Sequence, residues 1–325
     1  MNTRLVFLVF PLLTTLSLQA YDPTVTGPAP TYIDRNFAVS SDRILPVRIF
    51  LPNEKAVCPV IVFSHGLGGS REGSNFLGRH WSSRSYVTVF LQHPGSDSSV
   101  WQGEAPGERL QAMKRAASGA QFMNRVRDVK GTLDLLTRLN ADPKDALAGR
   151  LDLSHIGMSG HSFGAMTTQA VAGESLGTGI LGKGASLTDT RIRAAVIMSP
   201  SPLAKVDPQT SFGAVALPWL LMTGTHDGAP SGLSSVTPAD RLKIYPALPP
   251  GDKYELVLDQ AEHSVFTDRK LPGEHKERNP NHHRVILATS TAFWDATLKN
   301  DAAAAAWLKH DARSVMEEKD CWQFK

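Results

Sequence analysis

The sequence has little of several features that would assign it to a specialised class. Only 2 of its 325 residues are cysteines, Cys58 and Cys321, which is too few for a disulfide-rich scaffold or a cysteine metal site. Basic residues barely outnumber acidic ones, 34 against 31, and this scattered excess excludes the basic stripe that nucleic-acid binding requires. What is present, 42 % apolar and 20 % charged residues, is ordinary globular composition and excludes disordered, fibrous and multi-span membrane proteins.

The first twenty residues have the layout of an export signal. Arg4 gives a positive start, and the apolar run Leu5–Leu13 is shorter than the roughly 20 residues that span a bilayer. We expect residues 1–20 to be removed and the protein to be secreted or periplasmic with no stable membrane anchor; a retained N-terminal helix is the alternative. Export would allow a Cys58–Cys321 disulfide, although two unpaired cysteines are equally compatible with the sequence.

The rest of the chain alternates short apolar runs with helical patterns, which predicts βαβ units, a mostly parallel sheet and one domain over residues 21–325. We expect Tyr21–Ala38 to form an extended lead-in, Gly173–Thr190 to form a glycine-rich surface loop, and Ala229–Asp252 to form a loop that borders a substrate cleft. The expected helices are Phe122–Leu139 and Ala288–Leu308. The expected strands are Ile44–Leu51, Val57–Ser64, Tyr86–Leu91, His155–Ser159, Arg193–Met198, Trp219–Thr223 and, as the last one, Tyr254–Leu258.

The most informative motif is G-H-S-F-G, from Gly160 to Gly164. It fits the pattern G-x-S-x-G, in which a serine stands on a sharp turn between a strand and a helix. Its context supports this interpretation, because the strand candidate His155–Ser159 comes before it and small, helix-compatible residues follow. A glycine-rich turn with an ordinary serine is the alternative. We therefore identify Ser162 as the candidate nucleophile.

A serine nucleophile needs a base and an acid, which follow it in the chain order serine, aspartate or glutamate, histidine. Asp227 lies just beyond the strand candidate Trp219–Thr223, and His263 lies in the loop beyond Tyr254–Leu258. Because parallel strands gather their site at their carboxyl ends, we predict Asp227 as the acid and His263 as the base. The alternatives are an aspartate that caps a turn and a solvated loop histidine.

Five other residues compete for these roles. His226 comes before the last expected strand and breaks the chain order, and Asp259 and Glu262 lie too close to His263 in sequence to orient it across a cleft. His282 and His283 follow an Asn-Pro-Asn stretch far from any strand end, which favours surface or loop positions. The eleven histidines include no H-E-x-x-H and no other metal-ligand spacing, so no metal or cofactor is expected.

Acyl transfer also needs donors for the oxyanion. The turn supplies the backbone N–H of Phe163, and the glycine-rich loop Phe63–Gly69 supplies a second donor, which we assign to the N–H of Leu67. His65 is expected to pack beneath this loop without reacting. Trp101 follows a loop at a strand end, where lining the substrate pocket and plain packing are both open.

With these residues placed, the chain resembles the serine-esterase branch of the α/β-hydrolase superfamily, above all the platelet-activating-factor acetylhydrolase and dienelactone-hydrolase-like group. The resemblance covers roughly residues 37–308. It implies the α/β-hydrolase fold, esterase or lipase-like chemistry with no cofactor, and the Leu67 and Phe163 amides as oxyanion donors. The matching stretches are Phe63–Gly68, Arg125–Val129, Gly160–Ala165 and Phe293–Ala296.

These inferences predict a hydrolase of carboxylic esters. Ser162 would attack the carbonyl, His263 would transfer the proton, and Asp227 would orient the histidine. The expected partner is a small-molecule or lipid ester (a short-chain acyl ester, an acetylated lipid or a polyester), with no nucleic acid; the oligomeric state is left open. Two alternatives remain, a serine peptidase or amidase with the same triad and an inactive hydrolase fold that only binds.

Overall fold

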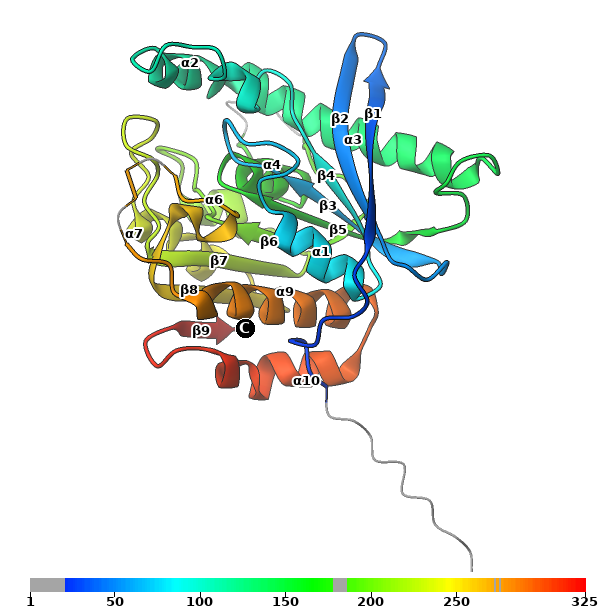
Figure 1. Ribbon diagram of the computed structural model, residues 1–325. Coiled ribbons are helices and arrows are strands. Elements are labelled where there is room, and N and C mark those ends of the chain that lie inside the picture. The colour runs from blue at the N-terminus through cyan, green and yellow to red at the C-terminus, as the bar shows by residue number, and fades with distance from the viewer. Residues whose placement is uncertain (1–20, 178–185, 272, 275) are drawn as a thin grey trace, which may run out of the picture.

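Nine strands among the described residues form one sheet, which is parallel in its centre (Figure 1). The computed structural model describes residues 21–177, 186–271, 273–274 and 276–325, so the expected signal lies outside them. The strand order is β1-β2-β4-β3-β5-β6-β7-β8-β9, and the strands from β4 to β8 pair in parallel. The strands are β1 Thr31–Ser40, β2 Arg43–Leu51, β3 Cys58–Ser64, β4 Val87–Leu91, β5 Leu151–His161, β6 Ile192–Met198, β7 Trp219–His226, β8 Lys253–Glu262 and β9 Cys321–Phe324.

Helices cover both faces of this sheet, so α3 and α4 pack on one side and α1, α9 and α10 on the other (Figure 1). The fold class predicted from the sequence, a mostly parallel sheet flanked by helices, is therefore confirmed. The helices are α1 Asn75–Ser83, α2 Arg109–Ala116, α3 Gly119–Ala141, α4 Phe163–Val171, α6 Pro208–Phe212, α7 Pro238–Arg241, α8 Ile244–Ala247, α9 Pro280–Leu298 and α10 Ala302–His310, with short 3₁₀ turns η1 Ser98–Val100, η2 His263–Phe266 and η3 Ala312–Val315.

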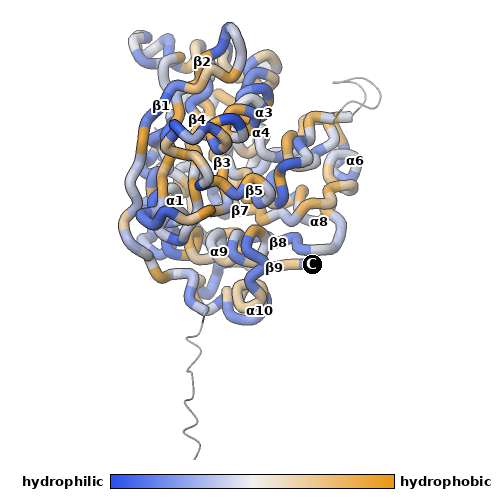
Figure 2. Tube along the Cα trace, turned by 90° about the vertical axis from the view of Figure 1, so that its right-hand side faces the viewer, coloured by the Kyte–Doolittle hydropathy of each residue, from blue (hydrophilic) through white to orange (hydrophobic). Residues whose placement is uncertain are grey.

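The central strands are buried on both sides, which explains their nearly continuous apolar sequences. In β3, Val60 and Val62 point into the core beneath α3 and α4, whereas Ile61 and Phe63 point into the core beneath α1 and α9. Hydrophobic residues accordingly run through the middle of the molecule, where β3, β5 and β7 lie (Figure 2). This double burial fixes the carboxyl ends of the strands, from which the candidate site is built.

Two strands at the edges of the sheet were not predicted. The expected lead-in Tyr21–Ala38 contains the start of β1, which pairs with β2 and turns Ile33 and Phe37 inward while its other face stays exposed. Tyr254–Leu258 is not the last strand either, because β9 pairs antiparallel with β8. Both edge strands are largely exposed, so they lack the continuous apolar run by which the central strands were recognised.

The closing helical region is longer than predicted and consists of two helices. α9 begins at Pro280, where Asn279 caps its first turn, and Asp301 caps the start of α10. His282 and His283 therefore lie on a helix and not in a loop, and His282 is only 3 % exposed.

The expected loops Gly173–Thr190 and Ala229–Asp252 also differ from the prediction. The described part of the first buries Glu174 and Leu187, residues 178–185 lie outside the described residues, and the second contains α7 and α8.

The structure answers the question of the two cysteines. Cys58 on β3 is buried and free, and Cys321 on β9 is exposed and free. Five strand spacings separate β3 from β9. At about 4.8 Å per spacing, the two residues lie on the order of 20 Å apart, beyond the roughly 7 Å that a disulfide allows between Cα atoms. The sheet itself keeps them unpaired.

Candidate active site

Ser162 occupies a sharp turn between β5 and α4. Its backbone angles are φ 57° and ψ −115°, a strained conformation for a residue with a side chain. The flanking glycines are required by close approach, because a Cβ on Gly160 would lie 2.3 Å from the Gly164 carbonyl oxygen and a Cβ on Gly164 would lie 1.9 Å from the Ser64 oxygen. The turn thus presents the Ser162 side chain at the end of the sheet, as the motif predicted.

The structure brings Ser162, His263 and Asp227 into one chain of contacts. The Nε2 atom of His263 lies 2.9 Å from the Ser162 hydroxyl, and its Nδ1 atom lies 2.5 Å from Oδ1 of Asp227. Asp227 directly follows β7 and His263 directly follows β8, so the two residues stand at neighbouring carboxyl ends. Nδ1–H donating to Asp227 leaves Nε2 free to accept the Ser162 hydroxyl proton, the arrangement that a serine nucleophile needs.

Asp227 is completely buried and firmly held. Thr223 donates its hydroxyl to Oδ2 over 2.8 Å, while His263 contacts Oδ1. Burial by itself raises the pKa of the carboxyl, but the positive charge of Arg241 and the contact with His263 outweigh it, so the pKa of Asp227 lies below its usual value. The carboxylate is therefore charged at neutral pH and oriented toward the histidine.

The loop after β3 lies directly against the serine turn. A Cβ added to Gly66 would lie 3.3 Å from Cβ of Ser162. Among the described residues, the N–H groups of Leu67 and Phe163 donate to no protein acceptor, whereas the next amide, that of Gly68, donates to Ser96 over 2.9 Å. Phe163 also begins α4, whose N-terminus carries partial positive charge. The two amides thus fit the donor roles expected from the sequence.

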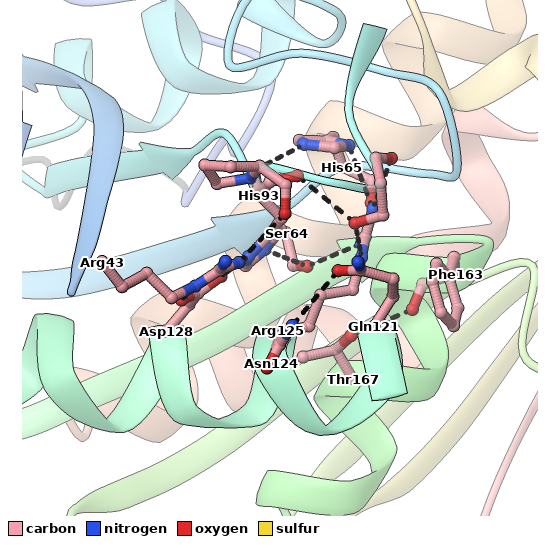
Figure 3. Close-up of polar contacts among 12 residues, drawn as sticks. Arg43, Ser64, His65, His93, Gln121, Asn124, Arg125, Asp128, Phe163 and Thr167 are labelled. Carbon is pink, nitrogen blue, oxygen red and sulfur yellow. Dashed lines mark hydrogen bonds and ion pairs between the residues drawn. The ribbon is translucent and has the colours of Figure 1, made fainter. Parts of the chain in front are cut away.

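Arg125 of α3 holds this loop in place through hydrogen bonds to its backbone (Figure 3). Its guanidinium donates to the carbonyl oxygens of His65 over 2.6 Å and Gly66 over 3.3 Å, and to the Ser96 hydroxyl over 2.8 Å. The same group lies 4.4 Å from the centre of the Phe163 ring. Sequence reasoning used Arg125 only as part of a matching stretch; the structure shows that it joins both halves of the candidate oxyanion site.

A second layer of polar residues supports the loop (Figure 3). Asp128 pairs with Arg43 and accepts from Nδ1 of His93 over 2.8 Å, and Nε2 of His93 lies 2.9 Å from the Ser64 hydroxyl. Nε2 of His65 accepts the backbone N–H of His93 over 3.0 Å. His65 is buried, which lowers its pKa well below the usual value, and it lies beneath the loop as expected.

Trp101 lies at the end of η1, and its indole N–H donates to the Gly68 carbonyl over 2.8 Å. The side chain of Arg109 lies over its ring, 5.7 Å from the centroid. Of the two roles left open by the sequence, packing is the one that the structure shows, because Trp101 packs against the loop that carries Leu67. Its contact with substrate stays a prediction.

None of the competing residues takes a place in the contact chain. His226 is exposed, and Nε2 atoms of His282 and His283 contact the backbone oxygens of Asp259 and Val265. Sequence reasoning missed His161, inside the motif, whose Nε2 lies 2.9 Å from the His263 carbonyl oxygen and whose ring lies 4.7 Å from the His263 ring.

The expected cleft loop contributes a residue that sequence reasoning also missed. Arg241, at the end of α7, is 2 % exposed and lies beside Asp227. The signal for α7 was available, because Thr237-Pro238-Ala239-Asp240 reads as a capping box with proline in the first turn. The proline- and serine-rich composition of the segment masked it.

Two features are absent from the part of the chain that the structure describes. No three histidine, cysteine, aspartate or glutamate side chains gather there in a way that would hold a metal ion. No helix in the same part of the chain has the length and apolar character needed to cross a membrane.

The sheet, the strained turn at Ser162 and the order serine, aspartate, histidine together define an α/β-hydrolase of the serine type. Residues 45–201 match the family model described as platelet-activating factor acetylhydrolase, isoform II. Over these residues the chain is similar to the platelet-activating-factor acetylhydrolase-like serine esterases, and the predicted resemblance is confirmed. It is thus a serine ester hydrolase. The match includes Ser162 and ends before Asp227 and His263, and no curated protein sequence matches the chain significantly.

Proposed function

We propose that the protein hydrolyses carboxylic esters of short acyl groups through an acyl-enzyme on Ser162. The observation that carries the proposal is the unbroken contact from the Ser162 hydroxyl through the imidazole of His263 to the carboxylate of Asp227, with distances of 2.9 and 2.5 Å. A serine hydroxyl is a weak nucleophile at neutral pH, and an oriented neutral imidazole is the group that activates it.

In the first half of the reaction, the Ser162 oxygen attacks the ester carbonyl while Nε2 of His263 takes the hydroxyl proton. The carbonyl oxygen becomes an oxyanion, which the N–H groups of Leu67 and Phe163 stabilise. His263 then gives its proton to the departing alkoxide, and an alcohol leaves. Asp227 keeps Nδ1 protonated and stabilises the imidazolium without taking the proton itself.

In the second half, His263 removes a proton from water, and the hydroxide attacks the acyl-Ser162 carbonyl. The same two amides hold the second oxyanion. Its collapse breaks the bond to Ser162, and the serine oxygen recovers its proton from His263. The products are a carboxylic acid and an alcohol, and no other reactant is needed.

The substrate class is a small-molecule or lipid ester, and the matching family, described as an acetylhydrolase, favours acetyl and other short acyl groups. Acetylated lipids, simple short-chain esters and polyesters share this chemistry. We also propose export to the periplasm or the medium, from the layout of residues 1–20. N-terminal sequencing of protein from its native host tests this, and an intact Met1 would refute it.

A fluorophosphonate probe followed by a panel of esters tests the activity. Wild-type protein should be labelled at Ser162 and should hydrolyse p-nitrophenyl acetate faster than long-chain esters, while Ser162→Ala should do neither. An amide of the same acyl group is the control for a peptidase or amidase, and faster amide cleavage would replace the proposal by that activity. A folded wild-type protein without labelling or hydrolysis would indicate an inactive binding protein.

A further inference from the structure

The Ala229–Asp252 segment places a buried arginine against the acid and the base of the triad. The Nε atom of Arg241 lies 3.3 Å from Oδ1 of Asp227, the oxygen that also contacts His263, and one of its terminal nitrogens lies 3.3 Å from Nδ1 of His263. Only 2 % of the residue is exposed. An arginine side chain so fully removed from water requires partners for its donors.

The backbone around the triad supplies those partners. Nε–H of Arg241 donates to the Asp227 carbonyl over 2.7 Å, and Nη1 donates to the carbonyls of Ser199 and Pro200 over 2.7 and 2.8 Å and to the Ser201 hydroxyl over 2.9 Å. Ser199 directly follows β6, and Asp227 directly follows β7. One planar guanidinium therefore fixes two strand ends relative to α7.

Its charge acts on the triad as well. The charged or titratable groups that face His263 are Asp227, Arg241 and His161, with the Ser162 hydroxyl on the other side. The fixed cation of Arg241 lowers the pKa of Asp227, so this carboxyl group stays charged although it is completely buried. The charged Asp227 carboxylate is the group that accepts Nδ1–H of His263 and orients its ring.

We propose that Arg241 is a positioning residue of the triad, which holds the Asp227 carboxylate in place and, through it, the ring of His263. The inference rests on the proposed ester hydrolysis. It assigns the buried end of α7 to the catalytic apparatus, in addition to any role of the Ala229–Asp252 segment at the mouth of the site.

Two substitutions in the full-length chain separate geometry from charge. Arg241→Met removes both, whereas Arg241→Lys keeps the charge and loses the planar set of donors. The matched control is Arg48→Met, because Arg48 is a buried arginine on β2 that pairs with Asp34 and Glu72 and contacts no triad residue. Circular dichroism and thermal melting establish which variants are folded, and kcat and KM for p-nitrophenyl acetate are measured for each of them.

Arg241→Met is expected to lower kcat by about 10- to 100-fold at little change in KM. Arg241→Lys is expected to lower kcat about tenfold, also with little change in KM. Arg48→Met is expected to change neither quantity. If Arg241→Met does not fold, the kcat of Arg241→Lys decides.

Wild-type kcat in folded Arg241→Met, or in Arg241→Lys where that variant decides, would overturn the inference. So would a rise in KM as large as the loss of kcat in Arg241→Met, because a merely structural arginine would disturb substrate binding as well. A wild-type enzyme that hydrolyses esters while these variants match it refutes only the inference. A wild-type protein that is neither labelled by fluorophosphonate nor active on esters refutes the proposed function and this inference with it.

Discussion

The buried carboxyl group of Glu174 should make the stability of the folded protein depend on pH. It follows α4 in the Gly173–Thr190 loop and is only 4 % exposed. One carboxyl oxygen accepts from the Gln169 amide over 3.3 Å, and the other finds no hydrogen-bond partner among the described residues. Burial is the main cause that raises the pKa of Glu174 to about 8, which the Gln169 contact offsets only in part.

The direction in which pH changes the free energy of unfolding follows from the pH at which Glu174 loses its proton in the unfolded and in the folded state. The unfolded chain loses the Glu174 proton near pH 4.5, whereas the folded chain keeps it to about pH 8. The free energy of unfolding is therefore undiminished by this group below about pH 4.5 and falls as the pH rises toward 8. At about 1.4 kcal/mol per pH unit, the loss between pH 5 and pH 8 is roughly 3 to 4 kcal/mol.

Glu174→Gln removes this pH dependence, because an amide stays neutral. It leaves an amide N–H group in the place of the unpartnered oxygen, which costs about 1–3 kcal/mol at every pH. We expect the variant to be slightly less stable than the wild type at pH 5 and more stable at pH 8. Relative to the wild type, its free energy of unfolding should rise by roughly 3 kcal/mol between the two.

Urea unfolding followed by circular dichroism at pH 5 and pH 8 measures both values. Glu318→Gln is the matched control, because Glu318 is exposed, and its stability should follow the wild type at both values of pH. A Glu174→Gln variant whose difference from the wild type stays constant within about 1 kcal/mol between pH 5 and pH 8 would refute the reasoning.

Three further predictions concern the site. Ser162→Ala and His263→Ala should each lower kcat on p-nitrophenyl acetate by about 10⁴- to 10⁶-fold, and the variant with both changes should be little worse. Asp227→Asn should lower kcat on the same substrate by about 10²- to 10⁴-fold. Gly164→Ala should lower the free energy of unfolding by about 3 kcal/mol or more in urea titrations, because its Cβ has no space. Arg125→Met should lower kcat by about tenfold or more with a small change in KM if it orders the oxyanion loop; an equal KM effect would contradict that role.

The parts of the site that the sequence predicts are those with a strong local rule. Ser162 stands on a turn that its flanking glycines and backbone angles require. Asp227 and His263 could be chosen because each comes directly after a buried apolar strand, and neighbouring parallel strands end at the same edge. The distances between these residues come only from the structure, whereas their position at one edge of the sheet can be predicted from the sequence.

What the sequence did not predict depends on contacts between distant segments. Arg241 reads as an ordinary charged residue, because nothing local reveals that α7 folds back onto the ends of β6 and β7. Arg125 is similar: its partners are carbonyl oxygens about 60 positions earlier in the chain. Edge strand β9 has four residues and follows a charged stretch, so only its pairing with β8 identifies it as a strand.

That pairing has a consequence for the order of events during synthesis. β8 carries His263 just beyond its end. Its outer edge is covered by Cys321–Phe324, and Lys325 and Lys253 extend the pairing with backbone hydrogen bonds of 2.9 and 3.1 Å. Until residues 321–325 have been synthesised, β8 presents a row of unpaired N–H and C=O groups to any other nascent chain. The strand that precedes the proposed catalytic base is thus the last of the described strands to be shielded, and crowded or prematurely terminated chains would associate there first.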